Sequence, residues 1–294
     1  MRHFLEVDDL SPGELARVLE LARMDPAPEV LARRGMALLF EKPSARTRNS
    51  SEMAVFQLGG HPITIRGEEV GFDRRESVED ITRVLGQYHA AIGARVFDHK
   101  VLERMAAVST VPVVNLLSDL AHPCQALADL LTLQGHFGRL AGLKMAWVGD
   151  GNNVCRSLLL GASLVGADFS AACPPGFEPD PGAVEVARRR GISVTITSDV
   201  GEAVRGADVV STDTWVSMGQ EQDQQARRSA FAGYRVNPSV MAGAAAGAVF
   251  FHCLPAHRGE EVTDEVIDGP QSLVWPQAAN RLHAFRGLLL WMFS

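Results

Sequence analysis

The sequence predicts an α/β protein with two doubly wound domains, each built on a parallel sheet. The chain has 294 residues, which is enough for about two domains. Short apolar runs alternate with segments of helical periodicity in both halves, a pattern typical of parallel strands joined by helices. The alternation pauses around residues 135–142 and then restarts. We therefore expect domains at 1–138 and 139–294.

The elements of the first half follow from apolar runs and helix caps. Ser11 and Glu14 form a capping box with a proline between them, which predicts the first helix. Residues 36–40 are continuously apolar, as expected of a strand buried on both faces. Further helices begin near Ser44 and Ser77, and residues 66–76 are polar and predicted to form a surface loop. The expected strands are 36–40, 62–65, 90–97 and 111–115, and a helix covers 126–134.

The second half repeats the pattern. A tight turn at 149–153 separates its first strand from a helix with an apolar face. The last helix, 277–293, is expected to pack back toward the first domain. The expected strands are 143–148, 169–173, 192–197, 207–212 and 249–253, and a further helix covers 183–190.

Composition excludes several classes of protein. The formal net charge is −7 and no long basic run occurs, which argues against a nucleic-acid-binding surface. No apolar run approaches the roughly 20 residues of a membrane helix, and acidic residues follow the start too soon for a signal peptide. The four cysteines are scattered without a C-x-x-C pair, which fits a reducing cytoplasm.

The stretch from Ser44 to Arg48 is the first candidate binding site. It lies where a predicted strand ends and a helix begins, so unpaired backbone N–H groups and the helix dipole favour an anion there. Ser44 and Thr47 add hydroxyl groups, while Arg46 and Arg48 add forked, charged donors that match phosphate. From this stretch alone, a phosphate site and an ordinary helix cap with two solvated arginines are equally plausible.

Other polar residues also follow predicted strands. Ligands of open α/β sheets bind beyond the carboxyl ends of the strands, and two such edges facing each other would form an interdomain cleft. We therefore expect an active site in such a cleft. The strand-end candidates besides the Ser44 stretch are Arg95, His122, Gln125, Asn153, Asp213 and Cys253.

Each of these motifs has an ordinary alternative. His122 could polarise a carbonyl group or simply begin a helix, and Asp213 could bind an amine or cap a helix. The turn at 149–154 resembles half of a dinucleotide fingerprint, but Val154 occupies the third glycine position and no acidic residue follows the next strand. A nucleotide cofactor is therefore not expected. His252 and Cys253 match no helical metal motif, which favours a cysteine without metal.

Taken together in their order, the motifs resemble the aspartate/ornithine carbamoyltransferase family over nearly the whole chain. The segments at 217–219 (Ser-Met-Gly) and 252–255 (His-Cys-Leu-Pro) are similar to the ornithine branch. The segments that carry the resemblance are 40–48, 95–97, 122–125, 213–219 and 252–255.

The resemblance implies transfer of the carbamoyl group of carbamoyl phosphate to the δ-amine of L-ornithine, giving citrulline and phosphate in arginine biosynthesis. It implies that carbamoyl phosphate binds first, to the N-terminal domain, and that no metal or organic cofactor is needed. It also implies a homotrimer or a multiple of trimers. The implied carbamoyl phosphate residues are Ser44, Ala45, Arg46, Thr47, Arg95, His122, Gln125, Cys253, Leu254 and Arg281. The implied ornithine residues are Asn153, Asp213, Ser217 and Met218. The implied catalytic residues are Arg95, His122, Asp213, Cys253 and Arg281.

Two departures from the family pattern bear on the substrate. Ala45 stands where members usually carry threonine, and Gly71-Phe72-Asp73 stands where ornithine enzymes usually carry glutamine, a hydrophobic residue and glycine. A carbamoyltransferase for a modified ornithine or another amine is therefore an alternative. A nucleotide-dependent oxidoreductase and a catalytically silent relative are further alternatives, disfavoured respectively by Val154 and by the intact polar motifs.

Overall fold

The computed structural model describes residues 2–216 and 221–294. The chain divides into two compact units, one of Met1–Leu131 with Ala279–Ser294 and the other of Thr132–Ala278. The division runs through two helices, α6 (Pro123–Phe137) and α13 (Val274–Phe293). The expected boundary at 138/139 lies just after α6. The final helix, included in 139–294 but expected to pack back toward the first domain, contributes most of its length to the first unit.

The first unit is built on a four-stranded parallel sheet in the order β2-β1-β3-β4. β1 is one of the two inner strands, in keeping with its apolar run from Met36 to Phe40, which is buried on both faces. The strands are β1 (Gly35–Phe40), β2 (His61–Arg66), β3 (His89–Arg95) and β4 (Val113–Leu117). The helices are α1 (Pro12–Leu21), α2 (Ala45–Gln57), α3 (Gly67–Val70), α4 (Val78–Tyr88) and α5 (His99–Val108).

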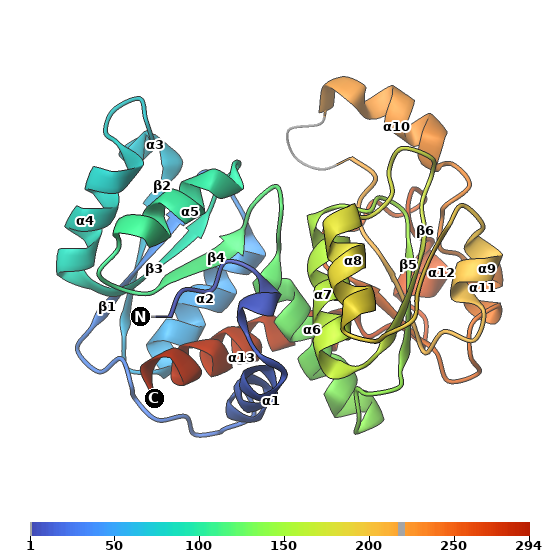
Figure 1. Ribbon diagram of the computed structural model, residues 1–294, viewed down its shortest axis with the longest axis horizontal. Coiled ribbons are helices and arrows are strands. Elements are labelled where there is room, and N and C mark those ends of the chain that lie inside the picture. Colours follow the sequence, from blue (N-terminus) through green and yellow to red (C-terminus); the bar gives the residue numbers. More distant parts are fainter. Residues whose placement is uncertain (1, 217–220) are drawn as a thin grey trace. The chain divides into compact units, whose positions relative to one another are not determined.

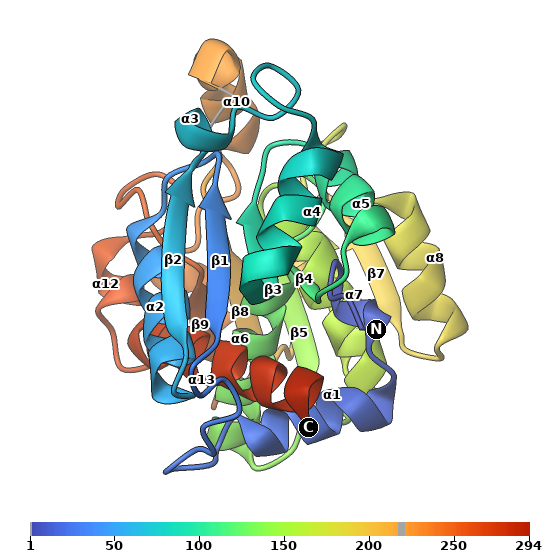
Figure 2. The ribbon, with the colours of Figure 1, turned by 90° about the vertical axis from the view of Figure 1, so that its left-hand side faces the viewer.

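Helices cover both faces of this sheet (Figures 1 and 2). Alternate residues of β1, Ala37 and Leu39, pack with Ile81 of α4 and Met105 of α5 in one core. Figure 1 shows α2 and α13 on the opposite face. The carboxyl ends of β1 and β3 are neighbours, since Phe40 pairs with Arg95. This edge therefore brings the start of α2 next to Arg95.

The predicted surface loop at 66–76 contains a short helix, α3. Glu68 and Glu69 lie in its first turn, where their negative charges interact favourably with the positive end of the helix dipole. Gly71 follows the helix as its C-cap and adopts the left-handed conformation. Val70 is the one residue of α3 that is buried, so the sequence lacked the apolar periodicity by which helices are recognised.

The second unit has a five-stranded parallel sheet in the order β7-β6-β5-β8-β9. The strands are β5 (Lys144–Val148), β6 (Asp168–Ala172), β7 (Val194–Thr197), β8 (Val209–Thr212) and β9 (Val249–His252). The helices are α7 (Asn153–Val165), α8 (Pro181–Arg189), α9 (Val200–Val204), α10 (Gln224–Phe231), α11 (Pro238–Ala242) and α12 (Asp264–Ile267).

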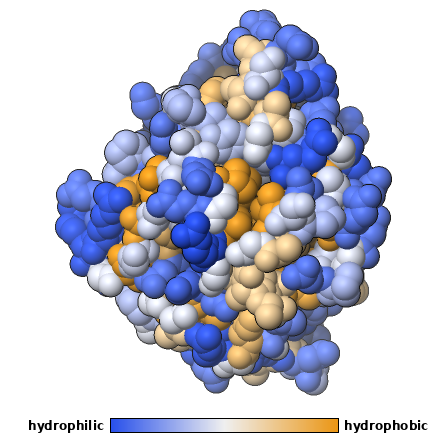
Figure 3. All heavy atoms as spheres, turned by 90° about the vertical axis from the view of Figure 1, so that its right-hand side faces the viewer, coloured by the Kyte–Doolittle hydropathy of each residue, from blue (hydrophilic) through white to orange (hydrophobic). Residues whose placement is uncertain are grey.

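Helices also cover both faces of the second sheet, with α7 and α8 on one side and α9, α11 and α12 on the other (Figure 1). Val148 and Val210 of the sheet pack with Val204, Met241 and Ile267 of the second group. Figure 3 views the molecule from the side on which these helices lie and shows apolar groups among polar ones. A small cavity of about 230 Å³ lies between α11 and α12 on this unit.

Two parallel sheets with helices on both faces confirm the predicted fold class. No helix in the described part of the chain is long and apolar enough to cross a membrane.

Candidate functional site

The start of α2 has the geometry of an anion site. Ser44 is its N-cap in an extended conformation, and its hydroxyl oxygen accepts a hydrogen bond from the Thr47 backbone N–H at 3.3 Å. The Ser44 hydroxyl in turn donates to Thr47 Oγ1 at 3.1 Å. Ala45 and Arg46 are exposed in the first turn, so their backbone N–H groups and the Arg46 guanidinium are accessible to a ligand.

Arg95 brings a buried positive charge to this helix start. It ends β3, is 7% exposed, and its Nη1 lies 3.5 Å from Thr47 Oγ1. A positive charge this close to the exposed start of α2 adds to the helix dipole and attracts a ligand that carries negative charge.

His122 lies immediately before α6 and is buried. Burial lowers the pKa of its imidazole well below 6.5, and the positive charges of Arg281 and Arg95 lower it further. The ring is therefore neutral at pH 7, in which form one nitrogen donates a hydrogen bond and the other accepts one. A neutral imidazole of this kind can donate to a carbonyl oxygen.

Gln125 is held at both ends of its amide. Its Oε1 accepts a hydrogen bond from Arg281 Nη1 at 3.0 Å, and its Nε2 donates to Asp129 Oδ1 at 2.8 Å. All three side chains are buried. Asp129 was not among the predicted residues, although its position one turn after Gln125 on α6 places both on the same helix face.

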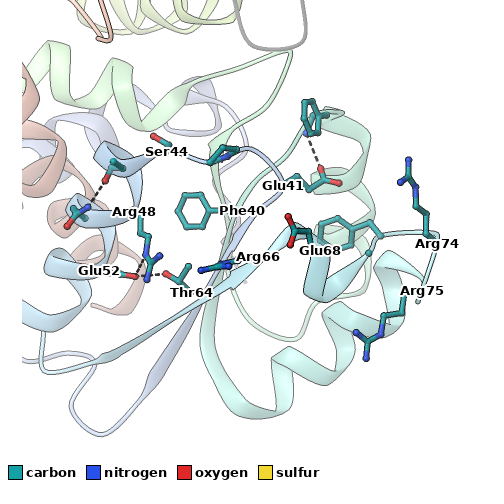
Figure 4. A pocket seen from close by; sticks show the side chains of 17 residues that line it. Phe40, Glu41, Ser44, Arg48, Glu52, Thr64, Arg66, Glu68, Arg74 and Arg75 are labelled. Carbon is teal, nitrogen blue, oxygen red and sulfur yellow. Dashed lines mark hydrogen bonds and ion pairs between the residues drawn. The ribbon is translucent and has the colours of Figure 1, made fainter.

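A cavity of about 1120 Å³ adjoins the start of α2 within the first unit. Its lining includes Ser44, Ala45, Arg48, Arg66 and Gly71. Ala45 and Gly71, the two positions at which this chain has a smaller side chain than the family pattern, therefore border the same cavity. Figure 4 shows the Arg48–Glu52–Thr64 contacts on one side of it: Glu52 Oε1 accepts from Arg48 Nε at 2.8 Å and from Thr64 Oγ1 at 2.5 Å.

Asp73, the remaining departure, has a structural role in this chain. It adopts the left-handed conformation with φ of 56°, which aspartate tolerates better than most residues. Arg104 holds its carboxylate through two hydrogen bonds of 2.6 and 2.9 Å and also bonds Glu79. The Arg104 contacts thus connect the loop to the first turn of α4.

The second unit contains a separate polar cluster around Asp213, which follows β8. Asp213 is 7% exposed. Asn152 Nδ2 donates to its Oδ2 at 2.8 Å, and Cys253 Sγ donates to its Oδ1 at 3.1 Å. The carboxyl ends of β5, β8 and β9, which are adjacent in the sheet, supply these three residues. A carboxylate in this setting is suited to bind an amine.

His252 supports the backbone beside Cys253. Its Nδ1 accepts a hydrogen bond from the Leu254 N–H at 2.9 Å, which places the proton of the neutral ring on Nε2, 3.2 Å from Glu261 Oε1. His252 and Glu261 are both fully enclosed. Leu254 has a φ of 62°, a conformation that is uncommon for leucine, and the His252 contact helps to hold it.

Among the described residues of the second unit, two groups of side chains have atoms close enough to surround a metal ion: Asp213 with His252 and Cys253, and His257 with Glu260 and Glu261. In the first group Cys253 donates to Asp213 and His252 bonds Leu254 and Glu261, so metal binding would break these contacts. In the group of His257, Glu260 and Glu261, the Arg228 guanidinium already pairs with Glu260 at 2.5 Å, so a metal ion would compete with this ion pair.

Within the first unit, the structure groups Ser44, Thr47 and Arg95, and links His122 and Gln125 to Arg281. Within the second, it groups Asp213 and Cys253. Asn152 donates a hydrogen bond to Asp213, and its neighbour Asn153 begins α7. Ser217 and Met218 lie outside the described residues. Besides Asp129, sequence reasoning missed Asn152 and Glu261. For Asn152 the signal was its N-cap position, since its Oδ1 accepts from Val154 and Cys155.

Comparison with known proteins also finds two domains in the chain. Residues 2–135 match the model of the aspartate/ornithine carbamoyltransferase carbamoyl-P binding domain, and residues 141–292 match that of the Asp/Orn binding domain. An ornithine carbamoyltransferase of Rhodococcus opacus is 50% identical, over 100% of this chain and 96% of the relative.

Solved structures of carbamoyltransferases are also similar to nearly the whole chain. The ornithine carbamoyltransferase of Pyrococcus furiosus is 44% identical, with a TM-score of 0.95 over 99% of this chain and 97% of that one. A mutant N-acetyl-L-ornithine transcarbamylase is 32% identical, with a TM-score of 0.89 over 99% and 100% of the two chains. Because both domain models and full-length relatives match, the chain belongs to the aspartate/ornithine carbamoyltransferase family.

Proposed function

We propose that the protein transfers the carbamoyl group of carbamoyl phosphate to the δ-amine of L-ornithine and releases citrulline and phosphate. The observation that carries this proposal is the first unit's set of buried donors, Arg95, His122 and Arg281, next to an exposed helix start. That combination suits a small ligand with a phosphate and a carbonyl group. The full-length relatives named ornithine carbamoyltransferase give independent support.

In this proposal the start of α2 binds the phosphate. Ser44, Thr47 and the backbone N–H groups of the first turn donate to its oxygens, and Arg46 and Arg95 supply positive charge. The alanine at position 45 contributes its backbone N–H and no hydroxyl group. Carbamoyl phosphate binds first, because these donors require no contribution from the amine substrate.

The carbamoyl group lies toward His122 and Gln125. Its carbonyl oxygen gains negative charge as the amine attacks, so donors from His122, Arg95 and Thr47 stabilise the transition state more than the ground state. Gln125, fixed by Arg281 and Asp129, accepts from the carbamoyl nitrogen. The backbone at Cys253 and Leu254 accepts from the same nitrogen.

Ornithine binds to residues of the second unit. Asp213, Asn153, Ser217 and the Met218 backbone hold its α-amino and carboxylate groups, while Asp213 and Cys253 orient the δ-amine. The amine nitrogen bonds to the carbonyl carbon, the bond from that carbon to the phosphate oxygen breaks, and one amine proton leaves with phosphate. The nucleophile must be neutral, although a free alkylamine has a pKa of about 10 by analogy with lysine. Holding both reactants in place supplies much of the rate.

An amine panel tests the substrate assignment. Citrulline formation is measured with carbamoyl phosphate and ornithine, N-acetylornithine or putrescine. We expect ornithine to give the highest kcat/KM, since the other amines lack a charged α-amino group or a carboxylate. The rate at subsaturating ornithine should rise from pH 7 toward pH 9 as more neutral amine becomes available.

A preference for N-acetylornithine would replace the ornithine assignment with the modified-amine alternative. Two observations are the reason for including N-acetylornithine in the panel. Ala45 and Gly71 border the same cavity, and one structural neighbour is an N-acetyl-L-ornithine transcarbamylase.

We also propose a homotrimer, or a multiple of trimers, in the cytoplasm. The family resemblance supports the assembly, and four cysteines without disulfides support a reducing compartment. Light scattering coupled to size exclusion measures the assembly directly; a monomer or dimer would contradict it.

A further inference from the structure

Arg227 is a buried arginine on a polar helix. It lies in α10 and is 9% exposed, whereas the side chain of its neighbour Arg228 is 43% exposed and pairs with Glu260 on the surface. Guanidinium groups are rarely enclosed unless they are paired and hydrogen-bonded. The contacts of Arg227 therefore indicate what its burial achieves.

The Arg227 guanidinium contacts two segments that flank the Asp213 cluster. Its Nη2 pairs with the Asp150 carboxylate, and its Nε donates to the Trp215 carbonyl oxygen at 2.6 Å. The ring centroids of Phe177 and Phe231 lie 4.9 and 5.3 Å from Arg227 Cζ, so the guanidinium charge also faces aromatic groups. One side chain thus joins α10 to the turn after β5 and to the segment after β8.

Both contacted residues are two positions from a member of the Asp213 cluster. Asp150 precedes Asn152, whose Nδ2 donates to Asp213, and Trp215 follows Asp213. The turn between Asp150 and Asn152 has little freedom, because a Cβ on Gly151 would lie 2.3 Å from the Pro179 nitrogen. Trp147 Nε1 donates to the Asp150 carbonyl oxygen at 2.8 Å and restrains the same turn. A change at Arg227 is therefore transmitted to Asn152 and Asp213 from two sides.

We infer that Arg227 is a positioning residue for the amine substrate, holding Asn152 and Asp213 in register through Asp150 and Trp215. The inference rests on the proposed function, in which Asp213 binds ornithine. Burial raises the pKa of Asp150 to about 6, although Arg227 opposes this shift. Asp150 is therefore a residue that needs Arg227 as its partner at neutral pH.

The experiment compares Arg227→Met and Arg227→Lys with the matched surface variants Arg228→Met and Arg228→Lys. KM for ornithine, KM for carbamoyl phosphate and kcat are measured for each, at a temperature where circular dichroism shows a folded protein. For Arg227→Met we expect KM for ornithine to rise at least about tenfold, with KM for carbamoyl phosphate within about twofold of wild type. Arg227→Lys should recover part of the loss, because it keeps the charge and loses the forked geometry. Both Arg228 variants should resemble wild type.

A double variant tests the route through Asp150. If Arg227 acts through Asp150, Asp150→Asn combined with Arg227→Met should raise KM for ornithine no more than the larger single effect. Folded Arg227 variants with an unchanged KM for ornithine, or with both KM values raised equally, would overturn the inference and leave the proposed function standing. A wild-type protein that forms no citrulline would overturn the proposed function itself, and this inference with it.

Discussion

Replacing Arg281 by methionine tests the carbamoyl side of the site. Arg281 donates to Gln125 Oε1 at 3.0 Å in a buried setting, and methionine keeps an unbranched apolar stem of similar shape while removing the guanidinium with its charge and donors. A hydrogen bond to a charged group is worth about 1.5–3 kcal/mol. If that contribution is lost in the transition state, kcat/KM for carbamoyl phosphate falls roughly ten- to hundredfold.

The same substitution should change the ionisation of His122. The Arg281 charge is the second cause of the lowered His122 pKa, after burial. Its removal should therefore raise the pKa toward the ordinary value, and NMR of labelled histidine would show His122 titrating at a higher pH than in wild type. His122→Gln assigns the signal.

Arg286→Met is the matched control on the same helix. Arg286 is also buried, but it donates to Gln57, to the Ala22 carbonyl and to the Met24 carbonyl. Its replacement should lower the melting temperature while leaving kcat/KM near wild type in the folded protein. If Arg281→Met keeps the wild-type kcat/KM and an unshifted His122, the proposed arrangement of the carbamoyl site is refuted.

Three further predictions concern other parts of the chain. Because the His122 pKa is lowered in the folded state, the unfolded chain binds a proton on this residue at a higher pH than the folded protein does. The free energy of unfolding should therefore decrease as the pH is lowered below 6.5. Urea titrations at several pH values should show a smaller decrease for His122→Gln. Gly151→Ala should destabilise the protein by about 1–3 kcal/mol, since its Cβ would lie 2.3 Å from the Pro179 nitrogen; unchanged urea unfolding would contradict the close packing of that turn. Cys253, the one cysteine that is not buried, should be alkylated first, and carbamoyl phosphate with norvaline should protect it; equal labelling by mass spectrometry with and without these ligands would place it outside the site.

Residues whose burial follows from apolar pattern were predictable from the sequence. The run from Met36 to Phe40 was expected to be a strand enclosed on both faces, and it forms the central β1. Ser44 was expected to start a helix after that strand, and it is the N-cap of α2. In both cases the local sequence and the final packing favour the same structure.

Residues whose surroundings come from distant segments were not predictable. Arg227 lies in a polar stretch that reads as solvent-exposed, yet Asp150, Phe177 and Trp215 enclose it. Glu261 likewise reads as a surface charge, yet its side chain is fully enclosed and lies against His252. Asn152 and Asn153 are chemically identical neighbours, and the hydrogen bond from Asn152 to Asp213 depends on the path of the turn, which the sequence does not specify.

The most direct test of the central claim follows the bond that the reaction forms. Carbamoyl phosphate labelled with ¹³C at the carbonyl carbon is incubated with the protein and with ornithine labelled with ¹⁵N at the δ-amine. The proposed function predicts a product whose NMR spectrum shows the ¹³C coupled directly to the δ-¹⁵N, together with an equal amount of inorganic phosphate. Label recovered only as bicarbonate, or a carbamoyl group on the α-nitrogen, would contradict it.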